Sequence, residues 1–186
     1  IMYINEFVSL YDSNEMVAPL DTIFHGRKEE LSNLIEAIRE NSVVIVHGSA
    51  GTGKTRIALE AIRRFSSEDE YRLLCVKNNN QPIYEDLIAK IDQPGSYLLF
   101  VDDANELSGL AQIIQYITRD KDEYSVKVVL TVRDYAKEPV FLIANKYTVP
   151  KMFSLLQFSD NDIKEFLNIN MGITNDLYVD QIIKIA

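Results

Sequence analysis

The sequence is poor in cysteine, tryptophan and cationic residues. Its 186 residues include one cysteine and no tryptophan. A lone Cys75 excludes an internal disulfide, and its place in the apolar run Leu73-Leu74-Cys75-Val76 is typical of a small core residue in a reducing compartment. Lys and Arg number 19 against 28 Asp and Glu, a formal net charge of -9. General electrostatic attraction to nucleic acid or anionic lipid is therefore not expected.

Long apolar segments are also missing. No stretch approaches the ~20 apolar residues that a membrane span needs, and no charged-then-apolar leader opens the chain, which predicts a cytoplasmic protein without a membrane partner. With 7 glycines, 5 prolines, 47% hydrophobic and 25% charged residues, the composition is that of a compact globular domain. The start at Ile1-Met2 and the end inside an apolar helical pattern predict a piece of a longer protein.

Apolar periodicity predicts strands alternating with helices, the pattern of a parallel sheet covered on both faces. Residues 1–22 show no such pattern and are expected to be an irregular linker. The expected strands cover residues 43–47, 73–76, 97–101, 126–132 and 152–156, and the expected helices cover 27–40, 57–65, 82–91, 107–117 and 139–145.

Two further helices are predicted at the C-terminal end. Ser159 and Asp162 form a capping-box type start, and Gly172 is placed to end the helix that follows. Thr174 or Asn175 then caps a last helix.

The strongest signal is a glycine-rich segment between the first strand and its helix. It reads Gly48-Ser49-Ala50-Gly51-Thr52-Gly53-Lys54-Thr55 and fits the pattern G-x-x-x-x-G-K-S/T. Its glycines let backbone N–H groups turn toward a phosphate chain, and the helix that begins near Gly53 adds partial positive charge. Lys54 supplies a full charge to the outer phosphates, and the Thr55 hydroxyl suits Mg²⁺. The segment is predicted to bind phosphates.

Two carboxylates end the third strand, in the sequence Leu98-Leu99-Phe100-Val101-Asp102-Asp103. Ligands of open α/β sheets bind at the carboxyl ends of the strands. Asp102 is therefore predicted to be the second contact to Mg²⁺, directly or through water. Asp103 is placed to orient or deprotonate an attacking water.

The strand at 73–76 separates the phosphate loop from the acidic strand in sequence, which leaves room for the strand at 126–132 between them in space. Its carboxyl end would then lie beside a terminal phosphate. There the sequence reads Thr131-Val132-Arg133-Asp134. Arg133 is predicted to sense or stabilise that phosphate, and Thr131 to hold a water. The alternative for Arg133 is an ion pair with Asp134 or with an acid on a helix.

Taken in order, these motifs resemble those of STAND NTPases, signal-transduction relatives of AAA+ ATPases that include the NB-ARC and NACHT switches of immune receptors and bacterial antiphage proteins. The resemblance spans residues 23–186. The segments that carry it are Phe24-His25-Gly26-Arg27 with Glu30-Leu31, the phosphate loop, Leu-Phe-Val-Asp-Asp, Leu-Thr-Val-Arg, and Leu156-Gln157-Phe158-Ser159.

The resemblance implies an α/β three-layer P-loop NTPase fold of the AAA+ type. Its sheet would have five parallel strands in the order 5-1-4-3-2, followed by the start of a helical lid. It divides the chain into a linker at 1–22, a core at 23–157 and a truncated lid at 158–186, which stops before the Gly-x-Pro-type motif of such lids.

The resemblance also implies ATP or ADP with Mg²⁺ as cofactors. The residues expected to bind the nucleotide are Phe24, His25, Gly26 and Arg27 against the adenine, Gly48 through Thr55 around the phosphates, and Arg56. In the family pattern the acidic pair holds Mg²⁺ and water, and the strand-four arginine reads the γ-phosphate. A transition-state arginine is not assigned among Arg56, Arg63, Arg64 and Arg119.

The implied function is an ATP-binding, slowly hydrolysing switch in a larger signalling or antiviral defence protein, with self-association and flanking sensor and effector domains. An AAA+-type remodelling ATPase acting on DNA or protein is the main alternative, which the net charge disfavours. A scaffold that holds ADP without turnover is another. A small-molecule kinase is disfavoured because no acceptor site can be argued.

Three weaker signals receive other interpretations. Asn145-Lys146-Tyr147-Thr148 lacks the aspartate that would pair with guanine, and no D-x-x-G follows the acidic strand, so GTP is disfavoured. His25 and His47 lack metal-ligand spacing and a nucleophile partner. They are expected to contact the adenine edge and to pack on a strand, respectively.

Overall fold

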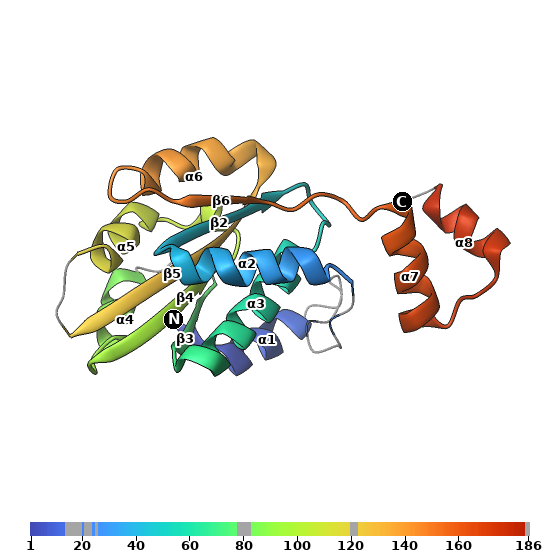
Figure 1. The fold of residues 1–186 in the computed structure, drawn as a ribbon. Coiled ribbons are helices and arrows are strands. Elements are labelled where there is room, and N and C mark those ends of the chain that lie inside the picture. The colour runs from blue at the N-terminus through green and yellow to red at the C-terminus, as the bar shows by residue number, and fades with distance from the viewer. Residues whose placement is uncertain (14–19, 21–23, 25, 78–82, 120–122, 185–186) are drawn as a thin grey trace.

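A computed structural model describes residues 1–186 except 14–19, 21–23, 25, 78–82, 120–122 and 185–186. It shows a sheet between two layers of helices, with a pair of helices beyond it at the C-terminal end (Figure 1). The strands lie in the order β1-β3-β4-β5-β2-β6. They are β1 Met2–Tyr3, β2 Val43–Gly48, β3 Arg72–Val76, β4 Gly95–Val101, β5 Tyr124–Arg133 and β6 Lys151–Ser154.

The predicted three-layer α/β class is confirmed, but the predicted strand number was wrong. The expected parallel strands are present as β6-β2-β5-β4-β3, and β1 adds an antiparallel strand at the edge beside β3. Every residue of β2 is buried, as are the last five residues of β4. These unbroken apolar runs are strands covered by helices on both faces.

Two hydrophobic clusters fill the layers on either side of the sheet. One holds buried residues of α4, α5 and α6, and the other holds those of α1, α2 and α3. The helices are α1 Ile4–Asp12, α2 Lys28–Glu40, α3 Lys54–Asp69, α4 Ile83–Lys90, α5 Leu110–Ile117, α6 Lys137–Ala144, α7 Asp160–Met171 and α8 Asp176–Ile183, with short 3-10 helices at Ala104–Glu106 and Asp134–Ala136.

The N-terminal segment is not irregular, contrary to the prediction for residues 1–22. Met2 pairs with Cys75 and Tyr3 with Leu74, and α1 follows directly. Phe7 is fully buried, with its ring edge-on to that of Phe100 at 5.5 Å between centroids. A two-residue strand has no periodicity, so only pairing with the distant β3 reveals it. Positions 14–19 and 21–22 of the predicted linker lie outside the described residues.

The helix predicted at 107–117 begins three residues later than predicted, at Leu110. Gly109 has a φ of 87°, a left-handed conformation that glycine adopts without strain. It separates the short helix at Ala104–Glu106 from α5, which begins at Leu110.

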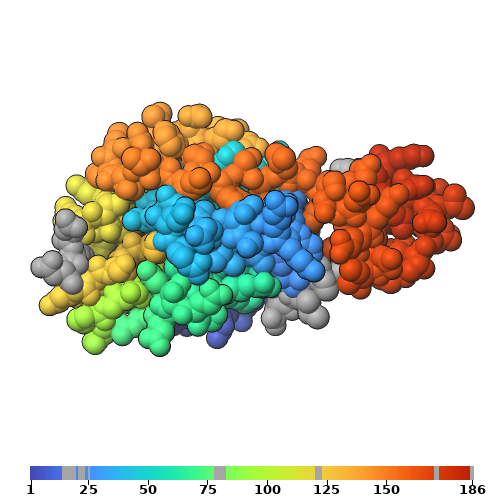
Figure 2. All heavy atoms as spheres, viewed as in Figure 1, coloured from blue at the N-terminus to red at the C-terminus, as the bar shows by residue number. Residues whose placement is uncertain are grey.

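In the C-terminal helix pair, α7 begins and ends as predicted, and α8 begins as predicted. The Ser159 hydroxyl accepts a hydrogen bond from the backbone N–H of Asp162, Gly172 ends α7 in the left-handed conformation, and Asn175 caps α8. The pair projects from one end of the molecule (Figure 2). The division into a core at 23–157 and a lid at 158–186 stays a prediction. Among the described residues, no helix combines the length and apolar character needed to cross a membrane.

Candidate nucleotide site

The carboxyl ends of β2, β5 and β4 meet at one edge of the sheet. Gly48, at the end of β2, is in register with Arg133, and Val101, at the end of β4, is in register with Leu130. The structure therefore brings together the phosphate loop, the acidic pair and Arg133, three segments that are far apart in the sequence.

The phosphate loop has the backbone that its glycines predict. Gly51 and Gly53 have φ angles of 79° and 83°, and α3 begins directly after them at Lys54. Gly48 is needed for a different reason, because a Cβ there would lie 2.4 Å from the carbonyl oxygen of Leu155. The N-terminus of α3 thus opens into the loop, where its partial positive charge favours an anion.

Lys54 is held inside its own loop. Its Nζ donates a hydrogen bond to the backbone oxygen of Ser49 at 2.7 Å, and the residue is 8% exposed. Burial lowers the pKa of the Lys54 ammonium, and the nearby Asp103 opposes that shift. A poorly hydrated ammonium with a single carbonyl partner is ready to pair with phosphate oxygens.

Thr55 and Asp102 are in direct contact. The Thr55 hydroxyl donates to Asp102 Oδ1 at 2.8 Å, and the Thr131 hydroxyl donates to the same oxygen at 2.6 Å. Burial raises the pKa of Asp102, while the two threonine hydrogen bonds lower it. A carboxylate that burial destabilises gains most from a nearby cation.

These oxygen donors fit Mg²⁺, which prefers hard ligands and completes its octahedron with water and phosphate. Among the described residues, no group of three or more His, Cys, Asp and Glu side chains gathers to hold a metal by itself. Thr55 and Asp102 are the protein groups here that could hold the ion.

Asp103 has an uncommon backbone conformation, with φ 46° and ψ 54°. Its N–H donates to the Thr131 hydroxyl at 2.9 Å, and its Oδ1 lies 3.9 Å from Nε of Arg133. Arg133 thus pairs with Asp103, which was not among the partners considered for it from the sequence. Both side chains remain partly exposed, 38% for Asp103 and 44% for Arg133, so a phosphate and a water can reach them.

His47 has a polar partner that the sequence analysis missed. Its Nδ1 lies 2.8 Å from Oδ1 of Asp134, whose other oxygen accepts a hydrogen bond from the Ser49 hydroxyl at 3.4 Å. Lys137 lies 3.8 Å from the same carboxylate. The hydrogen bond to His47 is the main cause that lowers the pKa of Asp134. In the sequence, the only sign of this contact is an aspartate directly after Arg133. The pairing of β2 with β5 is what places that aspartate beside His47.

Arg27, predicted to lie against the adenine, is buried and holds the connection to α7. Its Nη2 donates to the backbone oxygen of Leu156 at 2.7 Å, and its guanidinium lies 4.0 Å from the centroid of the Phe158 ring. Phe24 lies with its ring centroid 5.7 Å from the Arg56 guanidinium carbon. His25 lies outside the described residues.

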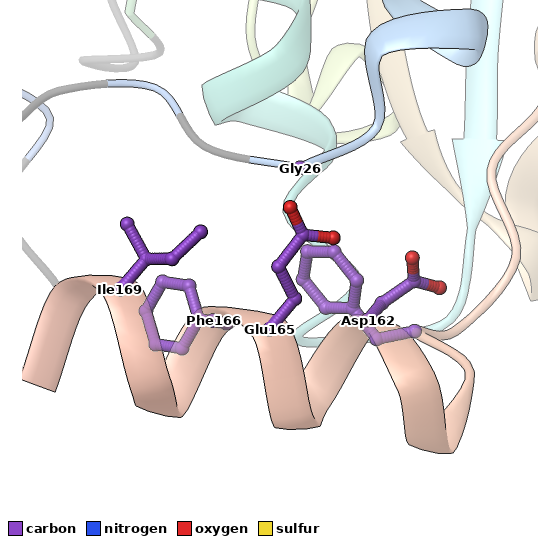
Figure 3. Close-up of a pocket in the computed structure, with 6 residues that line it drawn as sticks. Gly26, Asp162, Glu165, Phe166 and Ile169 are labelled. Atoms are coloured by element: carbon purple, nitrogen blue, oxygen red, sulfur yellow. The ribbon is translucent and has the colours of Figure 1, made fainter. Parts of the chain in front are cut away.

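A small pocket separates the Gly26 segment from α7 (Figure 3). Side chains of α7 point across it toward Gly26. It is lined by Gly26, Phe158, Asp162, Glu165, Phe166 and Ile169. The α7 residues were predicted only as part of a helix. Phe166 and Ile169 are 40% and 56% exposed, respectively. Their exposed apolar side chains form the α7 side of this pocket.

This fold and this site define a P-loop NTPase. The sequence of residues 26–138, more than half of the chain, matches the family described as Novel STAND NTPase 5, and the chain belongs to that family. No curated protein matches the sequence.

Several solved structures share the fold. The Orc1 protein of Aeropyrum pernix, solved in complex with DNA, is 18% identical with a TM-score of 0.55, over 82% of this chain and 51% of that one. RuvB of Thermotoga maritima is 18% identical with a TM-score of 0.60, over 86% and 56%. Hsp104, solved with ATPγS and FITC casein, is 15% identical with a TM-score of 0.61, over 77% and 29%. This chain therefore spans little more than half of these proteins at most.

Proposed function

We propose that this domain is a nucleotide switch that binds Mg-ATP and hydrolyses it slowly within a larger signalling or defence protein. The observation that carries the proposal is the meeting of Lys54, Thr55 and Asp102 with Asp103 at one edge of the sheet. Self-association and flanking sensor and effector domains are part of the proposal.

Each residue has a distinct role in this scheme. Loop amides and the start of α3 bind the phosphates, and Lys54 exchanges the Ser49 carbonyl for a phosphate oxygen. Thr55 and Asp102 hold Mg²⁺, which neutralises phosphate charge when bound. Asp103 orients the attacking water.

Arg133 supplies the response to the terminal phosphate. In the structure it lies beside Asp103. A γ-phosphate attracts this guanidinium away from Asp103, which frees the carboxylate to take a water. ADP lacks that phosphate, so the two nucleotides favour different arrangements of this edge.

The Gly26 segment is proposed to contact the adenine, and the pocket between Gly26 and α7, with a volume of about 10 Å³, admits the base only when α7 moves away from Gly26. Phe158, Phe166 and Ile169 offer apolar faces to the base, and Asp162 and Glu165 offer acceptors to its amino group. A base bound there contacts both the core and the C-terminal helix pair. Nucleotide binding would therefore affect how the helix pair is positioned on the core.

Binding is tested by isothermal calorimetry with ATP. Lys54→Ala should abolish detectable binding, whereas Lys146→Ala, an exposed lysine outside the site, should bind as the parent does. An unchanged ATP affinity in Lys54→Ala contradicts the proposal.

Turnover is tested by phosphate release. Asp103→Asn should keep ATP affinity and lose at least about 100-fold in rate, the lower range for removal of a general base. Hydrolysis at the parent rate in this variant would contradict the role proposed for Asp103. If the parent itself releases no phosphate and mass spectrometry of the denatured protein finds retained ADP, the scaffold alternative is supported instead.

A remodelling ATPase is the second candidate, favoured by the fold shared with Orc1, RuvB and Hsp104. The net charge of -9 weighs against DNA as its target. Phosphate release that rises severalfold on addition of duplex DNA or an unfolded protein would favour this candidate over the switch.

A further inference from the structure

A single carboxylate lies where the phosphate loop begins. Asp134 Oδ1 is 2.8 Å from Nδ1 of His47, the residue before the loop. Its Oδ2 accepts a hydrogen bond from the hydroxyl of Ser49, the second residue of the loop, at 3.4 Å. Asp134 directly follows Arg133, the last residue of β5. One side chain therefore contacts the chain on both sides of Gly48 and belongs to the segment that carries Arg133.

These contacts lie where the backbone pairing of two strands ends. His47 is in register with Val132 and Gly48 with Arg133, which is the last pair between β2 and β5. After Gly48 the chain leaves the sheet to form the phosphate loop. The Asp134 side chain thus continues the connection between the two segments past the end of their backbone pairing.

Asp134 accepts both hydrogen bonds as a carboxylate. The hydrogen bond to His47 is the main cause that holds the pKa of Asp134 below its ordinary value, so the group is ionised at neutral pH. An ionised carboxylate only accepts, and His47 Nδ1 must therefore carry a hydrogen and donate it. Hydrogen bonds to a charged acceptor are stronger than those between neutral groups.

Ser49 in turn holds residues that surround the phosphate position. Its backbone oxygen accepts a hydrogen bond from Lys54 Nζ at 2.7 Å and another from the Thr52 hydroxyl at 3.0 Å. Lys54 and Thr52 are both buried. A shift of Ser49 would therefore displace the Lys54 ammonium and the loop around it.

We infer that Asp134 is a positioning residue for nucleotide binding, which holds the start of the phosphate loop beside Arg133 through His47 and Ser49. The inference rests on the proposed function. A loop that is already held in its binding conformation loses less entropy when the ligand binds, so its affinity is higher. Simple electrostatics predicts the opposite, because a negative charge beside the loop repels phosphate. Removal of the carboxylate therefore distinguishes the two effects by sign.

The test compares two variants of Asp134 by isothermal calorimetry with Mg-ATP. Asp134→Ala should weaken binding by about 2- to 12-fold, the equivalent of one hydrogen bond. Asp134→Asn should bind nearly as tightly as the parent, because its amide can accept from His47 and donate to the Ser49 hydroxyl. Both variants lose the same charge, so the difference between them measures the hydrogen bonds. Equal affinities of the two variants, or parent-like or tighter binding by Asp134→Ala, overturn the inference.

Two further measurements show whether the effect belongs to the loop. Glu138→Ala removes an exposed acid in the first turn of α6 and should leave Mg-ATP affinity unchanged. Mg-tripolyphosphate, which has neither base nor sugar, should lose as much affinity for Asp134→Ala as Mg-ATP does. A loss confined to Mg-ATP, or an equal loss in Glu138→Ala, overturns the inference.

A double-mutant cycle tests the route through His47. His47→Phe keeps a ring on β2 and removes the contact with Asp134. It should weaken Mg-ATP binding by itself, and Asp134→Ala should then have a smaller effect than in the parent. Losses that add in full overturn the inference and leave the proposed function standing. If the parent binds neither Mg-ATP nor Mg-tripolyphosphate, the proposed function fails and the inference fails with it.

Discussion

The hydroxyl of Thr131 lies 2.6 Å from a carboxylate oxygen of Asp102 and donates a hydrogen bond to it. The same hydroxyl accepts the backbone N–H of Asp103 at 2.9 Å. Because β5 lies between β4 and β2, the strand that carries Arg133 also fixes both acids. Thr131 was predicted to hold a water, but its hydrogen goes to Asp102 and one of its lone pairs to Asp103.

Thr131→Val should therefore weaken both the fold and the site. It leaves a buried carboxylate with one donor fewer, a loss of about 1–3 kcal/mol in the free energy of unfolding measured with urea. Mg-dependent hydrolysis should fall more than ATP affinity, since the acids lose their alignment. Thr118→Val, which removes a hydroxyl bonded to the Ile114 carbonyl at the end of α5, is the control. Parent-like stability in Thr131→Val would contradict this account.

Arg27→Lys should loosen the connection to α7. A lysine cannot both stack on Phe158 and donate in the same fixed plane to the Leu156 carbonyl, so about 1–2 kcal/mol of local stability should be lost. Faster amide exchange in α7 measures this loss. Arg39→Lys serves as control because Arg39 pairs with exposed carboxylates of Glu36 and Glu68. Exchange in α7 at the parent rate would show that the guanidinium does not hold this helix.

The Asp134 carboxylate should stabilise the protein at neutral pH and lose that effect in acid. Contacts with His47, Lys137 and Ser49 lower its pKa, so the folded state favours the ionised form. This contribution is complete above the ordinary pKa of about 3.9 and disappears as pH falls through the lowered folded value. Because the carboxylate is 44% exposed, we expect at most about 1 kcal/mol.

Urea unfolding of Asp134→Asn against the parent, from pH 7 to pH 3, measures this difference. The difference in the free energy of unfolding between parent and variant should be largest at pH 7 and should shrink as the pH falls. Asp92→Asn, in the exposed turn before β4, is the control and should show no such trend. A gap that widens in acid would reverse the assigned sign.

Gly48→Ala should separate β6 from β2. The added methyl would meet the Leu155 carbonyl oxygen, whose residue donates its N–H to the His47 carbonyl at 2.8 Å. Such overpacking costs about 1–3 kcal/mol. Gly51→Ala is the control for backbone strain alone. A Cβ at Gly51 would meet no atom within 4 Å, so its cost of about 1 kcal/mol comes only from the positive φ of that residue. Exchange of the Leu155 amide should accelerate in Gly48→Ala and not in Gly51→Ala.

The sequence alone determined the features that depend on local pattern. Apolar runs located the five parallel strands, capping residues located α7, and the spacing from Gly48 to Thr55 identified the phosphate loop, because these depend on neighbours along the chain. The acids after β4 and the arginine after β5 could be named as site residues because parallel strands end at a common edge.

Only the tertiary structure decided which of these side chains meet. The hydrogen bonds of Thr131 and Thr55 to Asp102 and the contact of Asp134 with His47 join residues far apart in the sequence. The pairing of β1 with β3 also joins distant residues, and it makes Met2 and Tyr3, predicted to lie in a linker, part of the sheet. Such contacts depend on the order of the strands and on how closely the helices pack. Neither can be predicted from the spacing of residues along the chain.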